Sequence, residues 1–162
     1  MRKAFNKDST LPDIITEQKL FSLEIQKNGN YVLGVTQKAK GNMSSQDSEK
    51  HQYSDVRAYL INIPKELEKN ENNKTKLDKG SIYVDGNLRS DQRDFYIEAN
   101  LNAGKYALIV EIDWKIHTNE KIFSITSYGP DEVVFNDSTD LAISEVLRSA
   151  SDSIFKKFKS QI

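Results

Sequence analysis

The sequence predicts a mainly β protein, an antiparallel β-sandwich of about seven or eight strands with a C-terminal amphipathic α-helix. Two observations predict it. Between residues 19 and 136, apolar and polar residues alternate in short runs separated by turn-forming residues, which is typical of antiparallel strands. After residue 136 the apolar spacing becomes that of one helical face. We therefore expect a polar N-terminal tail over residues 1–18, the sandwich over 19–136 and the helix over 137–162.

The first two strands are expected on either side of Asn28-Gly29. Residues 21–25 and 31–35 alternate apolar and polar side chains. Because Asn-Gly is a preferred sequence for a tight turn between strands, these segments are predicted to pair as a β-hairpin.

The next region alternates between strands and polar segments. Residues 56–61 end before Pro64 and predict a third strand that is buried on both faces. Residues 65–80 carry many charges and almost no apolar side chains, so a solvated loop is expected there. A short strand is predicted over residues 82–84.

The strongest strand signals follow. Residues 95–101 alternate, Asn102-Ala103-Gly104 supplies a turn, and residues 106–114 form the longest alternating run. A run of that length, apolar on nearly every position, is expected near the centre of a sheet. Residues 123–125 and 133–135 predict two further short strands.

The C-terminal segment is predicted to be helical. Asn136-Asp137-Ser138 offers side chains suited to a helix N-cap, and Lys156, Lys157 and Lys159 lie where positive charge complements the helix dipole. The candidate partner-binding residues on its apolar face are Ile143, Val146, Leu147, Ile154 and Phe158. Two alternatives remain open, since this face can pack on a partner or on the chain's own sheet.

Composition limits the classes of function. The chain has 23 basic and 24 acidic residues and a net charge of −1, so no global field attracts nucleic acid or an acidic membrane. It has no cysteine, which excludes disulfides and cysteine nucleophiles. No stretch reaches the ~20 apolar residues that cross a bilayer, and no signal peptide is evident. We expect an intracellular protein, cytoplasmic or attached to a cytoskeletal or ciliary structure.

Side chains with metal-binding or acid-base chemistry are scattered. His51 and His117 fall in separate predicted loops, so structural or solvent-exposed roles are favoured over a shared metal site. Acidic residues near predicted strand ends are Asp85, Asp91, Asp94, Asp131 and Glu132. They lack the spacing of a calcium loop, so solvated turns are favoured. We predict no catalytic residue, no bound metal and no cofactor.

Trp114 has two interpretations, either part of an aromatic ligand platform with Tyr128 or a residue of the core. A single tryptophan on the apolar face of a long strand is more typical of a core residue, and we predict that role. Asp113, on the opposite face, is expected to pair with Arg57 or to cap a turn.

The order of the strand sequences resembles a known family. In succession they read FSLEIQKNGNYVLGVTQK, YSDVRAYLINI, YVDG, LNAGKYALIVEIDW and FSITSYGPDEV. This succession resembles the calpain-type β-sandwich, the domain that follows the protease core in calpain-family proteins, in its divergent protist form. The resemblance covers residues 19–135.

The resemblance implies a calpain-like domain without its protease core. Calpain catalysis uses a cysteine nucleophile and a histidine, and this chain has no cysteine, so no proteolysis is expected. The sequence departs from the family at Lys38-Ala39-Lys40-Gly41, where relatives often carry acidic and basic residues. The segment 65–80 also lacks the acid-rich character that accompanies a calcium response in some relatives.

These observations predict a non-catalytic protein-interaction module, a structural subunit bound to other proteins of a larger assembly. The alternative is a Ca²⁺- or phospholipid-responsive regulatory module acting beside a separate protease subunit. A weak Ca²⁺ response is compatible with either hypothesis, whereas binding to nucleic acid is not expected and membrane binding is disfavoured.

Overall fold

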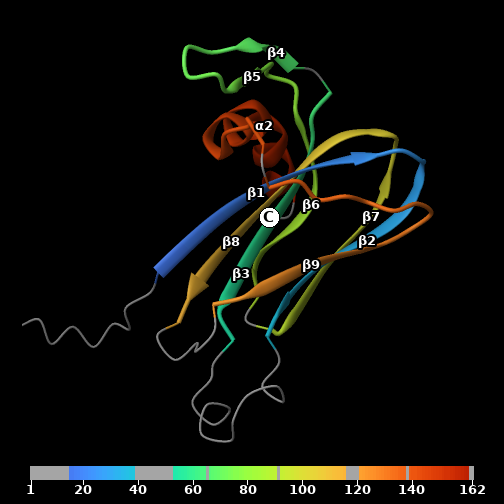
Figure 1. Ribbon diagram of the computed structural model, residues 1–162, viewed down its shortest axis with the longest axis vertical. Helices are drawn as coiled ribbons and strands as arrows, with labels where there is room; N and C mark the ends of the chain where they lie inside the picture. Colours follow the sequence, from blue (N-terminus) through green and yellow to red (C-terminus); the bar gives the residue numbers. More distant parts are fainter. Residues whose placement is uncertain are drawn as a thin grey trace, which may run out of the picture.

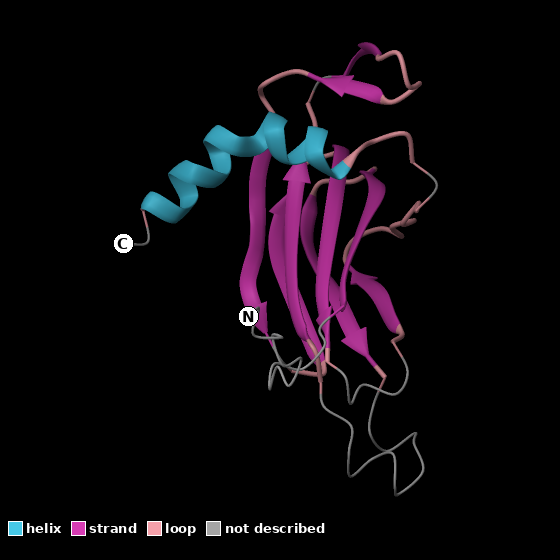
Figure 2. Ribbon diagram, turned by 90° about the vertical axis from the view of Figure 1, so that its left-hand side faces the viewer, coloured by secondary structure: helices cyan, strands magenta, loops and turns pink. Residues whose placement is uncertain are grey.

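The computed structural model describes residues 15–38, 53–64, 66–90, 92–115, 121–137 and 139–160, with residues 87–90 described by their backbone. Two antiparallel sheets pack face to face, and a single C-terminal helix lies against the outer face of the larger sheet (Figure 1, Figure 2). The predicted mainly β class, with antiparallel sheets and a C-terminal helix, is confirmed.

The larger sheet has four strands in the order β1-β8-β3-β6, and the smaller sheet has three in the order β7-β2-β9. Their bounds are β1 Ile15–Ile25, β2 Gly29–Gln37, β3 Asp55–Asn62, β6 Ile82–Ser90, β7 Asp94–Leu101, β8 Gly104–Trp114 and β9 Phe123–Tyr128. A separate pair, β4 Glu66–Lys69 and β5 Thr75–Leu77, adjoins the helix α2, Ile143–Lys159.

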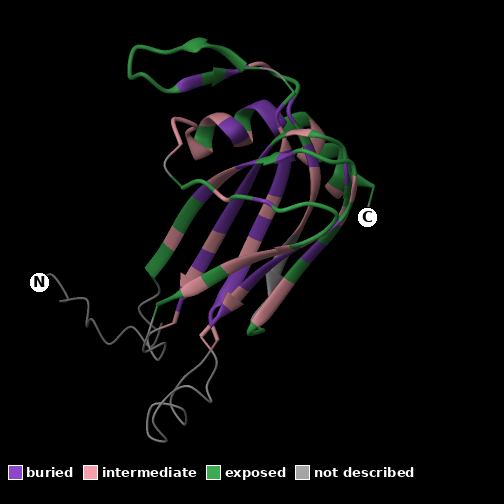
Figure 3. Cartoon of the chain, turned by 45° about the vertical axis from the view of Figure 1, so that its right-hand side comes forward, coloured by how far each residue is buried: buried purple, intermediate pink, exposed green. Residues whose placement is uncertain are grey.

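The strand β8 lies inside the four-stranded sheet, between β1 and β3, as its long alternating run predicts. Alternate side chains of β8 enter two different cores. Ala107 and Ile109 face the helix, whereas the side chains that enter the core between the sheets are Tyr106, Leu108, Val110, Ile112 and Trp114. β3 is likewise buried on both sides over most of its length. Figure 3 shows this burial along the central strands and, in the β4–β5 hairpin, the exposure of β4.

The predicted hairpin at Asn28-Gly29 is wrong. β1 pairs with β8 over its whole length, from Ile15 opposite Trp114 to Ile25 opposite Gly104, whereas β2 pairs with β7 and β9 in the other sheet. The turn therefore carries the chain from one sheet to the other. The turn between β7 and β8 does the same.

Several predicted boundaries also need correction. β1 begins at Ile15, so part of the segment assigned to the polar tail belongs to the sandwich, and residues 1–14 lie outside the described residues. The predicted loop over 65–80 contains β4 and β5, and Leu77 is buried because α2 lies against it. The short strand expected over 82–84 extends to Ser90 as β6.

The segment before the helix also differs from expectation. Residues 133–135 form no strand; Val133 is buried in the core between the sheets, and the chain forms one antiparallel bridge, from Asn136 to Ser22 of β1. The predicted N-cap near Asn136 is wrong. The helix begins later, its N-cap is Ala142, and no side chain caps it.

Candidate functional site

The helix α2 packs on its own sheet. Val146 and Ala150 are fully buried against the outer face of the four-stranded sheet, where they contact a second core. The other buried residues of this core are Leu20, Ile61, Ile63, Leu77, Tyr83, Ala107 and Ile109. Of the two alternatives left open by the sequence, the structure therefore adopts packing on the chain's own sheet.

Four of the five candidate partner-binding residues belong to this core or pack against it. Val146 has no exposed surface, so its assignment to a partner contact is corrected. Ile143, Leu147 and Ile154 are half-buried on the same core. Phe158, also half-buried, packs on Tyr83 with 6.1 Å between the ring centroids. The face that the sequence offered to a partner is used mainly inside the fold.

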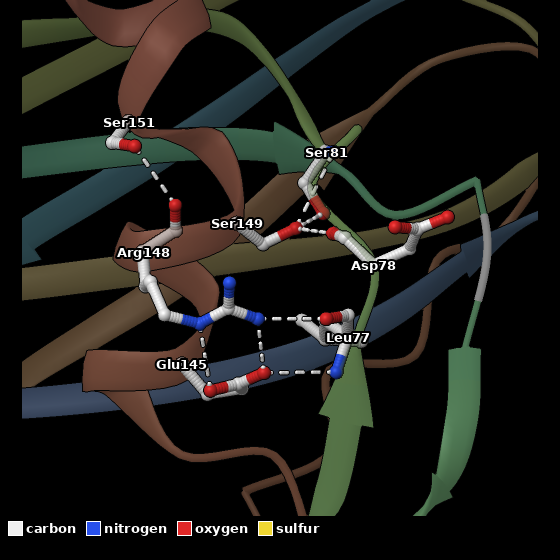
Figure 4. Close-up of polar contacts among 7 residues, drawn as sticks. All are labelled: Leu77, Asp78, Ser81, Glu145, Arg148, Ser149 and Ser151. Atoms are coloured by element: carbon white, nitrogen blue, oxygen red, sulfur yellow. Dashed lines mark hydrogen bonds and ion pairs between the residues drawn. The ribbon is translucent and has the colours of Figure 1, made fainter.

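A polar seam joins the first turns of α2 to β5. Arg148 donates two hydrogen bonds to Glu145, from Nε to Oε2 at 3.1 Å and from Nη2 to Oε1 at 2.6 Å. The same Glu145 oxygen accepts the backbone N–H of Leu77 at 3.0 Å, and Arg148 Nη2 donates to the Leu77 carbonyl at 2.7 Å (Figure 4). Both backbone groups of Leu77 are thus satisfied by the helix.

The next turns of the helix bond the start of β6. The Ser149 hydroxyl donates to the carbonyl of Asp78 and lies 2.6 Å from the Ser81 hydroxyl (Figure 4). One turn later, Ser153 Oγ accepts the backbone N–H of Tyr83 at 3.0 Å. Because β6 is an edge strand, Ser153 satisfies a backbone group that an edge otherwise exposes, whereas Ser149 bonds the segment that leads into β6.

The electrostatics of the seam follow from this geometry. The hydrogen bonds from Arg148 and from the Leu77 N–H favour the charged carboxylate and lower the pKa of Glu145 to about 2. Glu145 in turn raises the pKa of the Arg148 guanidinium. The sequence analysis did not identify this pair, although its i, i+3 spacing on a helix was a usable signal.

A polar ladder crosses the same sheet face beyond the reach of the helix. Arg57 on β3 bonds Glu111, and it also bonds Asp113 at 2.9 Å. The β1 side chains complete the ladder, since Thr16 donates to Asp113 at 2.8 Å and Gln18 donates to Glu111 at 2.6 Å. The predicted pairing of Asp113 with Arg57 is confirmed. These carboxylates are held by neighbours within the fold.

The other candidate residues do not converge. Trp114 is 1% exposed, which confirms its core role, and its indole N–H donates to Glu17 at 2.7 Å. Tyr128 is 66% exposed at the end of β9, so the two rings form no common platform. His51 and His117 lie outside the described residues.

The predicted acidic residues are spread over separate elements. Asp94 pairs with its neighbour Arg93, and Asp85 accepts the backbone N–H of Gly86. Asp131 accepts the N–H of Glu132, and Asp91 lies outside the described residues. Among the side chains that the structure describes, no three histidine or acidic groups gather as metal ligands would.

One side of the sandwich exposes apolar surface. It lies between β1 and β9, which are edge strands of the two sheets, and we call it the β1/β9 side. A hollow of about 320 Å³, the aromatic hollow, opens there. Its lining is Glu17, Lys19, Phe21, Lys121, Ile122, Phe123, Ile125 and Phe135. Phe21 and Phe123 meet edge-to-face with 6.3 Å between their centroids.

A second hollow of about 530 Å³, the helix-side hollow, lies on the opposite face of β1. It is lined by Gln18, Lys19, Leu20, Asp137, Thr139, Leu141, Ile143 and Ser144. Ile122 beside the aromatic hollow is 57% exposed, and Val134, near the β1 residues Ser22 to Glu24, is 71% exposed. The sequence analysis missed this surface because it depends on which strands lie at the edges.

No protein family, curated protein or solved structure matches this chain. Within the described part of the chain, no helix combines the length and the apolar content of a membrane span.

Proposed function

We propose that this chain is a non-catalytic protein-interaction module of calpain-like type, a structural subunit that binds other proteins of a larger assembly. The cytoskeleton or a cilium is the expected location. The calpain-like part of the proposal rests on the ordered succession of strand sequences described above.

The observation that carries the proposal is the β1/β9 side. Half-buried phenylalanines and the exposed Ile122 line its hollow, and Val134 adds an exposed apolar side chain near Ser22 to Glu24 of β1. Isolated apolar residues are normal on a protein surface, but several of them around one hollow are typical of a protein-binding surface. The helix, by contrast, stabilises the module itself.

The test follows the full-length protein in native cell extract by sedimentation, in chelator and in calcium. A photo-crosslinking residue at Ile122 samples the β1/β9 side, and one at Leu67, an exposed apolar residue on β4, serves as the matched control. We expect co-sedimentation with a large assembly in both conditions, with crosslinks from position 122 and few from position 67.

Two results would overturn the proposal. Migration as a small species in both conditions would remove the structural-subunit function. A shift to membranes or partners only in calcium would support the regulatory alternative.

A further inference from the structure

We propose that β1 accepts an extended segment of a partner protein as an additional strand, paired antiparallel to residues Ile15–Leu20. This inference rests on the proposed function, because it names where and how the module binds its partner. Strand addition supplies affinity through backbone hydrogen bonds, and pockets for alternate side chains supply selectivity.

The backbone of β1 provides the first argument. Its register with β8 is continuous, so successive residues direct their N–H and C=O groups alternately toward β8 and away from it. Ser22 directs both groups away from β8, to Asn136. Thr16, Gln18 and Leu20 therefore also direct theirs away from β8, and no described strand pairs with them.

The chain itself shows how this edge is used. Asn136 exchanges two backbone hydrogen bonds with Ser22, each 2.9 Å long, in antiparallel geometry. The chain then leaves β1 and turns toward α2. Asn136 thus pairs with β1 as the first residue of an added strand would. The described residues do not continue this pairing alongside Leu20, Gln18 and Thr16.

The two hollows flank this strand position, which no described strand fills. In an added strand, successive side chains point to opposite faces of the sheet. One set would enter the aromatic hollow, whose floor includes Phe21 and Phe123, and the other would enter the helix-side hollow beside Leu20 and Leu141. A single extended segment can therefore fill both.

The lining determines the chemistry of the occupant. The aromatic hollow is lined mainly by phenylalanine and isoleucine, and its acidic residue Glu17 is already bonded by Trp114 and by Lys19, at 2.7 and 3.6 Å. The helix-side hollow combines apolar Leu20, Leu141 and Ile143 with polar side chains from Gln18, Lys19, Asp137, Thr139 and Ser144. The occupant is therefore an extended segment with apolar side chains toward the aromatic hollow and both apolar and polar side chains toward the helix-side hollow.

The opposite edge of the same sheet is not equivalent. There α2 packs near the start of β6, and Ser153 accepts the Tyr83 N–H. The helix thus satisfies a backbone group at that edge of the four-stranded sheet, whereas at β1 the described residues pair only with the position of Ser22.

The direct test is hydrogen exchange of the full-length protein with synthetic peptides of about six residues, the typical length of a strand. One peptide is extended and alternates valine or phenylalanine with threonine, so that its apolar side chains can face the aromatic hollow and its threonines the helix-side hollow. Its control has the same sequence with alternate backbone amides N-methylated. We expect the first peptide to slow exchange at Thr16, Gln18 and Leu20, while Glu17 and Lys19, which bond β8, stay unchanged.

Variants separate binding from folding. Gln18→Pro removes an outward N–H and should lower peptide affinity at least about tenfold, since proline is tolerated at strand edges but blocks pairing. If that variant is unstable in denaturation, Ile122→Lys at the aromatic hollow takes its place, with Leu67→Lys as the matched exposed control. Only the variant at position 122 should weaken binding.

Each remaining outcome is decisive. Failure of every peptide to protect the even-numbered amides, or equal binding of the methylated control, overturns strand addition. Protection that rises with protein concentration in the absence of peptide assigns the edge to a second copy and overturns the proposed occupant. If Gln18→Pro still co-sediments with the assembly, the module function stands and this site fails; if the wild type does not co-sediment, the function itself fails.

Discussion

The side-chain oxygen of Asn28 accepts a hydrogen bond from the backbone N–H of Ala103 at 2.7 Å, and this bond joins the two turns at which the chain passes between the sheets. Each turn is followed by a tyrosine whose hydroxyl donates back four residues, Tyr31 to the Lys27 carbonyl and Tyr106 to the Asn102 carbonyl. The two turns between the sheets therefore share the same tyrosine hydrogen bond, and both lie at one end of the sandwich.

Asn28→Ala is expected to lower the free energy of unfolding by about 1 kcal/mol, the usual contribution of one such hydrogen bond. Asn28→Asp keeps an oxygen acceptor and should cost less. Urea denaturation of the three proteins measures the difference. Equal stabilities of all three would show that the bond does not hold the turns together.

Gly29→Ala is expected to destabilise the protein by about 1 to 3 kcal/mol, because forced overpacking moves backbone or rigid side chains. A Cβ at position 29 would lie 2.4 Å from the ring of Pro130. Gly80→Ala is the control, since a Cβ there meets no atom within 4 Å. Thermal denaturation compares the two variants, and similar melting temperatures would contradict the close contact with Pro130.

Val146→Asp is expected to destabilise or unfold the protein, because it places a charge without a partner in the core beneath α2. Phe155→Asp introduces the same charge on the same helix, where the native ring is 67% exposed, and should change stability by no more than about 0.5 kcal/mol. Circular dichroism during denaturation compares the two. A folded Val146→Asp protein of native stability would mean that α2 does not need the sheet.

The pH dependence of stability should report the seam between Glu145 and Arg148. The folded-state pKa of Glu145, about 2, lies below its unfolded value, so its stabilisation is present above about pH 4.3 and is lost as the pH falls toward 2. Because both side chains are partly exposed, the gain is about 1 kcal/mol. Glu145→Gln should therefore be less stable than wild type at pH 7, with the gap closing in acid. A difference in unfolding free energy between the two proteins that does not change with pH would exclude a contribution from the titration of Glu145.

Trp114→Ala should lower the free energy of unfolding by about 3 to 5 kcal/mol, as large aromatic deletions in a core do. Tyr128→Ala removes an exposed ring and serves as the control. Chemical denaturation measures both. A loss of partner binding with unchanged stability for Trp114→Ala would show that the ring has a surface role after all.

The positions of the strands could be predicted from the sequence because alternation is a local property. The long run in β8 predicted both its central place and its two faces. The pairing of strands could not be predicted in the same way. Asn28-Gly29 specifies a turn, but whether the following strand joins the same sheet depends on the distant residues of β7, β8 and β9.

The candidate site was predictable only in part. The apolar face of α2 is periodic and was identified, whereas the burial of Leu77 depends on the helix that covers it. The Asn136 side chain suggested a helix cap, but its backbone pairs with Ser22 instead, and the helix begins after it. The position of β1 at the edge of the described sheet follows from strand order, which a local pattern does not contain.

The pairing of β1 with β8 has a consequence for synthesis of the chain on the ribosome. Ile25 of β1 pairs with Gly104 of β8, so the hydrogen-bonded ladder cannot form until β8 has been synthesised. β1 therefore emerges from the ribosome long before its neighbouring strand. Long-range pairing of this kind slows folding and prolongs exposure of apolar segments. The helix α2, which follows all the strands in the sequence, then covers Ile61 and Ile109 and bonds Tyr83 of β6. The outer face of the four-stranded sheet therefore stays exposed on the growing chain until α2 has also been synthesised.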